Sequence, residues 1–165
     1  MAKLIILVLF FFYNASAEEK SELVFQKILK NHGEIELIDL NNNTIKLSDY
    51  KKDLLIINFW ATWCVPCIKE IPELLTLEAD FDDKLDILFV SVGLNPSDDI
   101  RFFLKKHNYK NVDVFLDDEL KISKKIEVTT IPSTIILDKS RNEIIRSSGY
   151  VKWDSQEIYK IIKDL

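Results

Sequence analysis

Residues 58–67 read NFWATWCVPC, and this stretch decides the fold. It contains the only two cysteines of the chain, Cys64 and Cys67. A disulfide between them would close so short a loop that it would constrain the unfolded chain very little. Because such a bridge adds little stability, we interpret the pair as a redox-active disulfide that opens and closes during function.

A strand and a helix are predicted on either side of the cysteine pair. The continuous apolar run 54–60 (LLIINFW) is typical of a strand buried on both faces. Helix is predicted from about residue 65 to 79, which places Cys64 at the helix N-terminus. Unpaired backbone N–H groups and the helix dipole stabilise a thiolate there. We therefore predict that Cys64 is the nucleophile and that Cys67, one turn deeper, is the resolving thiol.

The rest of the chain alternates strands and helices, which predicts an α/β domain with helices on both faces of a sheet. Further strands are expected at 34–40, 44–47, 86–92, 112–116, 133–138 and 143–149. Further helices are expected at 22–31, 97–107, 119–126 and 154–165. The first two strands form an N-terminal hairpin. The last two are joined by a polar turn and should be antiparallel, so the sheet is predicted to be mixed.

The N-terminus has the pattern of a secretory signal peptide. Lys3 precedes an apolar run over 4–12, and Ala15-Ser16-Ala17 resembles a cleavage site. We predict a cleaved signal peptide over 1–17 and one domain over 18–165, in the periplasm or otherwise outside the cytoplasm. An uncleaved membrane anchor is the alternative, although the apolar run is about half the roughly 20 residues that a spanning helix needs.

Charge and ligand counts argue against two other classes of protein. The chain has 22 Lys and Arg against 27 Asp and Glu, a net charge of −5, whereas nucleic-acid binding needs clustered cations. No nucleic-acid partner is expected. Two cysteines supply at most half of a structural zinc site, and His32 and His107 are predicted to lie at the surface without ligand-like spacing. No metal is expected, and a copper or zinc chaperone stays an alternative.

Other residues after the cysteines extend the motif. Glu70 lies three positions beyond Cys67 and should share its helix face, where it would either move protons or simply face solvent. Pro72 interrupts the predicted helix. Ile131-Pro132 directly precedes a predicted strand, a place where an X-Pro bond can be cis.

With these motifs in place, the sequence from about residue 34 to 165 resembles the thioredoxin superfamily. The resemblance implies a thioredoxin fold, with a mixed central sheet flanked by helices. It also implies a cis Ile131–Pro132 bond beside the disulfide, with the substrate peptide pairing as an added strand. The substrate-binding site is expected to contain Trp63, Val65, Pro66, Ile131 and Pro132.

Finer features resemble the TlpA/ResA/CcmG group of extracytoplasmic thiol–disulfide reductases. Pro132 follows Cys67 by 65 positions, and the excess over thioredoxin fits one extra strand–helix unit within 92–116. In ResA-like members a glutamate at the position of Glu70 lies near the active site, so the resemblance favours a proton carrier. Asn58 replaces the buried aspartate of thioredoxin and cannot carry a proton. Ser133 replaces the acidic residue usual in CcmG-like proteins, which favours TlpA or ResA.

The expected function is reduction of partner-protein disulfides. No histidine or positive charge separates the cysteines, and a nearby carboxylate disfavours a thiolate, which favours a reducing potential. The resemblance implies apocytochrome c or a copper-delivery protein for cytochrome oxidase as substrate, and a membrane electron donor of the DsbD or CcdA type. No flavin or nicotinamide motif is present, so no cofactor is expected, and the protein should be a monomer. A disulfide oxidase and a thiol peroxidase are further alternatives.

Overall fold

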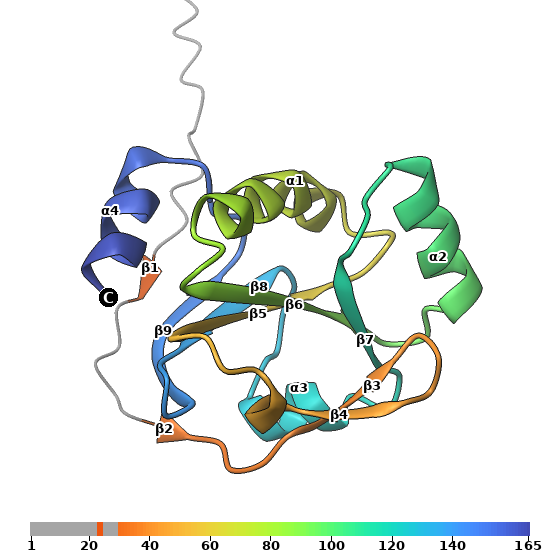
Figure 1. The fold of residues 1–165 in the computed structure, drawn as a ribbon. Helices are drawn as coiled ribbons and strands as arrows, with labels where there is room; N and C mark the ends of the chain where they lie inside the picture. Colours follow the sequence, from red (N-terminus) through yellow and green to blue (C-terminus); the bar gives the residue numbers. More distant parts are fainter. Residues whose placement is uncertain (1–22, 25–29) are drawn as a thin grey trace, which may run out of the picture.

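The computed structural model describes residues 23–24 and 30–165, coloured along the chain in Figure 1. The predicted signal peptide over 1–17 lies outside these residues. Within the described residues, no helix combines the length and the apolar character needed to cross a membrane.

Three parallel strands form the centre of the sheet, in the spatial order β5-β6-β7. Their bounds are β5 (Leu54–Trp60), β6 (Leu85–Val92) and β7 (Asp113–Asp117). All seven residues of β5 are buried, as its continuous apolar sequence predicts. On the far side of β5, β8 (Ser133–Leu137) and β9 (Asn142–Ser148) pair antiparallel, so the sheet is mixed as expected.

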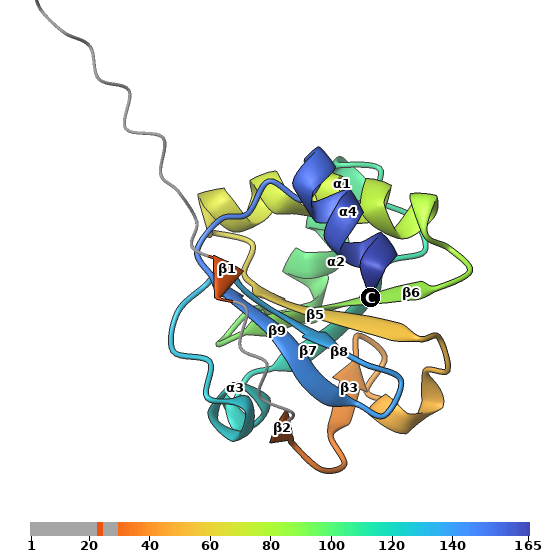
Figure 2. The same cartoon turned by 90° about the vertical axis from the view of Figure 1, so that its left-hand side faces the viewer.

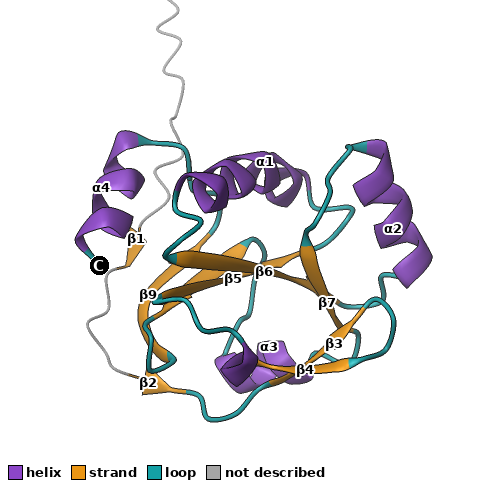
Figure 3. Cartoon of the chain, in the orientation of Figure 1, coloured by secondary structure: helices purple, strands orange, loops and turns teal. Residues whose placement is uncertain are grey.

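Helices cover both faces of this sheet, as Figure 3 shows by colour. One face carries α1 (Val65–Asp80), α2 (Ser97–Lys106) and α4 (Gln156–Asp164), and the other carries the short α3 (Lys121–Ile126). Each face buries its own cluster of apolar side chains. The α/β class is confirmed, and α1 is the helix that extends from the cysteine pair.

The predicted hairpin and the predicted inserted unit lie side by side. The hairpin consists of β3 (Glu36–Asp39) and β4 (Thr44–Lys46), followed by a single turn of 3-10 helix over Leu47–Asp49. In the inserted unit, α2 leads into β7, and β3 pairs antiparallel with β7. The hairpin therefore extends the sheet beyond the inserted strand.

The helix predicted over 22–31 is wrong where the structure describes it. Leu23–Val24 forms β1 and Lys30–Asn31 forms β2, and both strands pair antiparallel with β9 (Figure 2). Residues 25–29 lie outside the described part. The edge of β9 offers unpaired backbone N–H and C=O groups, and pairing with this edge overrides a weak local helix pattern.

Candidate active site

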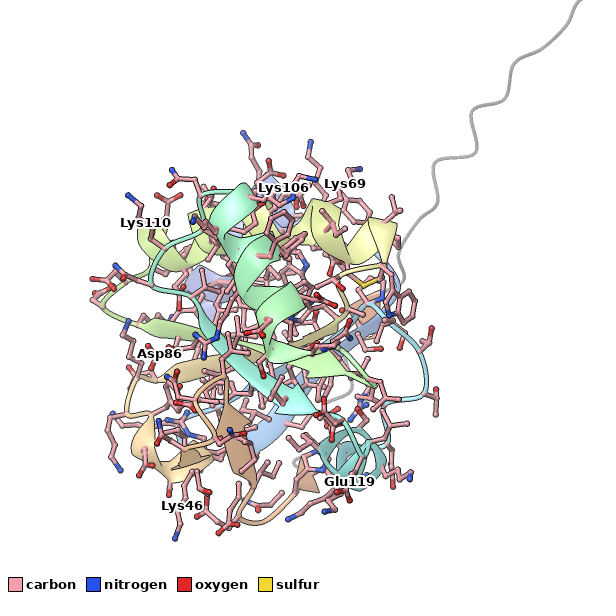
Figure 4. All side chains as sticks on the ribbon, turned by 90° about the vertical axis from the view of Figure 1, so that its right-hand side faces the viewer. Lys46, Lys69, Asp86, Lys106, Lys110 and Glu119 are labelled. Carbon is pink, nitrogen blue, oxygen red and sulfur yellow. A yellow bond between two sulfur atoms is a disulfide. The ribbon has the colours of Figure 1, made fainter. Side chains whose placement is uncertain are left out.

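The disulfide joins Cys64 and Cys67 at the start of α1, and Figure 4 draws it as a yellow bond. Their Cα atoms are 5.2 Å apart. The Cys64 carbonyl accepts a 3.0 Å hydrogen bond from the Ile68 N–H, which places Cys64 directly before the first turn of the helix. Cys64 is 6% exposed and Cys67 is 0% exposed. Cys64 is therefore the more solvent-accessible of the two cysteines.

The Ile131–Pro132 peptide bond is cis, as the resemblance implied. The next residue, Ser133, begins β8 and lies opposite Phe59 of β5. β5 ends one residue later, at Trp60, and the chain then enters the disulfide turn, which covers residues 61–67. This register therefore brings Pro132 to the same end of the sheet as the disulfide turn. Pro132 is buried and Ile131 is half-buried.

Glu70 is fully buried in α1, one turn beyond Cys67. Its Oε1 accepts a 2.6 Å hydrogen bond from the Val151 N–H, and its Oε2 accepts a 3.1 Å hydrogen bond from Asn58 Nδ2. Burial raises the pKa of Glu70 from 4.5 to about 7, although these donors oppose the rise. The solvent-exposed alternative is therefore wrong. A carboxyl group with this pKa can accept and release a proton near neutral pH.

The Asn58 amide connects Glu70 to strand β8. In addition to its bond to Glu70, Nδ2 donates a 2.9 Å hydrogen bond to Thr134 Oγ1. Asn58 is 0% exposed and Thr134 is 1% exposed. Asn58 Oδ1 has no hydrogen-bond partner among the described residues. Asn58 thus belongs to the site through its amide, a role that the sequence did not predict.

A second carboxylate of α1, Glu73, holds the loop between β9 and α4. Glu73 Oε2 accepts a 3.0 Å hydrogen bond from the Trp153 N–H, and Oε1 accepts a 2.8 Å bond from the Tyr150 hydroxyl. Lys69, labelled on α1 in Figure 4, lies with its Nζ 3.9 Å from the centre of the Tyr150 ring. Together with Glu70, these contacts fix the loop against the helix that carries the cysteines.

Apolar side chains around the disulfide are open to solvent. Those of the disulfide turn are Trp63, Val65 and Pro66. Leu94, in the loop between β6 and α2, is 90% exposed. Thr62 Oγ1 donates a 3.0 Å hydrogen bond to Asn95 Oδ1, which fastens that loop to the turn. Exposed apolar side chains therefore come both from the disulfide turn and from the loop that Asn95 joins to it.

The two histidines differ in their surroundings. His107 is exposed as predicted, but the prediction for His32 is wrong, because its side chain is 4% exposed. Pairing of β2 with β9 brings His32 Nε2 to 2.6 Å from Glu143 Oε2, and Arg146 Nε also donates to Glu143 at 2.6 Å. Within residues 23–24 and 30–165, no group of three or more His, Cys, Asp or Glu side chains is arranged to hold a metal ion.

Three parts of the site were not predicted from the sequence: the Val151 amide, Glu73 and the Leu94 loop. Val151 contributes a backbone group, so its side chain gives no signal. Glu73 repeats the three-residue spacing that links Cys67 to Glu70, and this repeat is visible in the sequence. Thr62 and Asn95 are brought together only by the parallel pairing of β5 with β6.

Comparison with known protein families matches residues 28–147 to the AhpC/TSA family. The chain belongs to this family. It is 29% identical over 145 residues to the thiol-disulfide oxidoreductase ResA of Bacillus cereus, covering 87% of this chain and 80% of the relative. The expected likeness to the TlpA/ResA/CcmG group of the thioredoxin superfamily is confirmed, and so is an enzyme of the thiol–disulfide oxidoreductase type.

Solved structures support the same fold. The exposed lipoprotein thioredoxin of Streptococcus pneumoniae is 26% identical, with a TM-score of 0.68 over 80% of this chain and 99% of the other. A DsbF homologue from Corynebacterium diphtheriae is 21% identical, with a TM-score of 0.74 over 94% of this chain and 99% of the other. The predicted thioredoxin fold is confirmed.

Proposed function

We propose that this AhpC/TSA family member is an extracytoplasmic protein-disulfide reductase in which Cys64 attacks and Cys67 resolves. The observation that carries the proposal is a disulfide at the N-terminus of α1 with a buried, neutral-range carboxyl group one turn further along. The greater exposure of Cys64 supports the order of attack. Glu70 is assigned the role of proton carrier.

The first step starts from the reduced enzyme. The Cys64 thiolate attacks one sulfur of a partner disulfide and forms a mixed disulfide with it. The partner's second sulfur leaves as a thiolate and takes up a proton. Backbone N–H groups at the N-terminus of α1 stabilise the attacking thiolate.

The second step releases the partner. The Cys67 thiol gives its proton to the Glu70 carboxylate, and the Cys67 sulfur attacks the Cys64 sulfur. The mixed disulfide breaks, the Cys64–Cys67 disulfide forms, and the partner's remaining sulfur leaves and is protonated. Over both steps the partner gains two electrons from the enzyme and two protons, one released by Cys67 through Glu70 and one taken from solvent. A membrane donor of the DsbD or CcdA type would return two electrons to the enzyme.

The partner polypeptide is proposed to bind across the disulfide turn and the cis-proline loop. Its backbone would pair with that of Ile131, next to Pro132. Trp63, Val65 and Pro66 would pack against the side chains that flank its cysteine. Their exposure in the oxidised enzyme supports this assignment.

The reducing direction is tested by the reduction potential of the Cys64–Cys67 pair. The two residues between the cysteines are uncharged, and a carboxylate at Glu70 opposes a stable thiolate. We expect a potential nearer the about −270 mV of thioredoxin than the about −120 mV of DsbA. A value near the latter would make the protein a disulfide oxidase and contradict the proposal.

Location outside the cytoplasm is proposed from the signal-peptide pattern over 1–17. The similarity to an exposed lipoprotein thioredoxin supports it. N-terminal sequencing of the exported protein distinguishes a cleaved chain that begins at Glu18 from an anchored chain that retains the apolar run.

The substrate is proposed to be apocytochrome c, at its haem-attachment cysteines, or a copper-delivery protein of cytochrome oxidase assembly. A Cys67→Ala variant would trap partners as stable mixed disulfides on Cys64, and a Cys64→Ala variant is the control. Capture of either protein supports the proposal and chooses between its two branches. Stoichiometric metal binding without reductase activity, or rapid consumption of peroxide, would instead favour a metal chaperone or a thiol peroxidase.

A further inference from the structure

The Asn58 side chain presents an unusual hydrogen-bonding pattern in the core. Its Nδ2 donates to both Glu70 Oε2 and Thr134 Oγ1, whereas its Oδ1 is buried with no partner among the described residues. The great majority of buried polar groups find a partner, and the Asn58 amide meets this requirement by directing both of its N–H donors at Glu70 and Thr134.

The pattern fits the ionised state of Glu70. A carboxylate can only accept hydrogen bonds, so it requires a donor from Asn58, and Nδ2 supplies one. Oε1 already accepts from the Val151 N–H, a backbone donor that cannot reverse its role. A proton added to Glu70 therefore belongs on Oε2, the oxygen that faces Asn58.

Protonation of Oε2 would disrupt its hydrogen bond from Asn58 Nδ2, because the new O–H group would face an N–H group, and both are donors. A half-turn of the amide removes this conflict. The turn places Oδ1 where Nδ2 now lies, and a carbonyl oxygen can accept two hydrogen bonds. It would accept one from the Glu70 O–H and one from the Thr134 hydroxyl, which rotates from acceptor to donor.

We propose that the Asn58 amide turns over when Glu70 gains or loses its proton, and that Asn58 is thereby a positioning residue for proton transfer. In both orientations Asn58 keeps two hydrogen bonds to the same two residues, and the turn exchanges Oδ1 for Nδ2 at the buried place that has no partner among the described residues. Glu70 stays hydrogen-bonded as carboxylate and as carboxylic acid. The catalytic benefit of this turn rests on the proposed role of Glu70 as proton carrier, but the turn itself does not.

Asn58 is the hydrogen-bond partner of Glu70 that can present either a donor or an acceptor. The other groups that bond to Glu70 do not have this choice. Glu73, on the same helix, is the charged side chain that acts on Glu70, and as a like charge it favours the protonated form. Strands β5 and β8 contribute the neutral Asn58 and Thr134. The loop after β9 contributes the Val151 N–H, which is a fixed donor to Glu70, and Trp153, whose backbone N–H donates to Glu73.

The test is an NMR titration of the oxidised full chain, in which the cysteines do not titrate. The ¹³C shift of the Glu70 carboxyl group reports its ionisation. Nuclear Overhauser effects (NOEs) between the Asn58 amide protons and Thr134 report the amide orientation. We expect these NOEs to be present at high pH and lost at low pH, with the midpoint of the Glu70 titration. Their persistence on both sides of that midpoint would overturn the proposal.

Two substitutions provide an independent measurement. Asn58→Leu keeps a similar volume but removes a partner that both forms of Glu70 share, so the pKa of Glu70 should rise by less than about one unit. Thr134→Val is the matched control, because Thr134 bonds to Asn58 in both orientations, and it should move the pKa by less than about half a unit. A rise of more than about one unit in Asn58→Leu would contradict the proposal, because it would show that Asn58 bonds the carboxylate form alone. The titration involves no turnover, so a failure of the proposed reductase activity would be seen separately.

Discussion

Glu70 and Val151 join the helix that carries the cysteines to the loop before α4, through a 2.6 Å hydrogen bond from the Val151 N–H to Glu70 Oε1. The two residues are 81 positions apart in the sequence. A hydrogen bond to an ionised carboxylate is about twice as strong as one between neutral groups. The protonation state of Glu70 therefore affects both α1 and the loop that rests on it.

Replacement of Glu70 by glutamine should slow the resolving step. The amide cannot accept the Cys67 proton, and general-base catalysis typically contributes about 10²–10⁴-fold. Stopped-flow measurement of mixed-disulfide resolution should show a decrease of at least about tenfold at pH 7 and loss of the rate inflection near pH 7. Glu157→Gln, at an exposed position of α4, is the control. Identical pH profiles for Glu70→Gln and the wild type would remove Glu70 from the mechanism.

The same carboxyl group should make stability depend on pH. Glu70 has a pKa of about 7 in the folded protein and near 4.5 when unfolded, so between these values the folded state holds a proton that the unfolded state has lost. The free energy of unfolding should therefore fall as pH rises from 4.5 to 7, by up to about 3 kcal/mol from this group.

Urea denaturation of the oxidised wild type and of Glu70→Gln, each at pH 4.5, 6 and 8, measures this contribution. Other titrating groups cancel in the difference between the two proteins. That difference should change in favour of the variant as pH rises and level off above pH 7. A difference that stays constant with pH would show that the pKa of Glu70 is not raised by folding.

Leu94 should contribute to partner binding without affecting the chemistry of the disulfide. Its loop is fastened to the disulfide turn by Thr62 and Asn95, and burial of a leucine side chain contributes about 1.5–3 kcal/mol. Leu94→Asp should reduce the rate with a protein substrate by about tenfold or more while the reduction potential stays unchanged. Phe102→Asp, at a 68% exposed position of α2, is the matched control. Equal losses in both variants would assign the effect to general surface charge.

His32 should stabilise the fold without taking part in catalysis. Its ring lies 2.6 Å from the buried Glu143, and loss of a buried hydrogen-bond partner costs about 1–3 kcal/mol. His32→Ala should lower the free energy of unfolding by that amount and leave the reduction potential unchanged. His107→Ala changes the same residue type at an exposed position. If the two variants were equally stable, the contact with Glu143 would make no net contribution to the free energy of unfolding.

The parts of the molecule that follow from local sequence were predictable. A few neighbouring residues were enough to predict each of three features: the buried strand β5, the position of Cys64 before α1, and the X-Pro bond at Ile131-Pro132. The surroundings of Glu70 were not, because burial of its carboxyl group depends on Asn58 and on the distant Val151 amide. The N-terminal segment was assigned to the wrong structure for a related reason. Its strands exist through pairing with β9, more than one hundred residues later.

The placement of the short strands at both sides of the sheet has a consequence for self-association. β1 and β2 occupy the outer backbone groups of β9, and the hairpin occupies those of β7. A second copy of the chain that sought to extend the sheet sideways would meet two-residue or three-residue strands, which are poor templates for intermolecular pairing. The proposed pairing of a partner polypeptide with the backbone of Ile131 would thus add a strand at one chosen place, while the long strands of the sheet remain protected from aggregation.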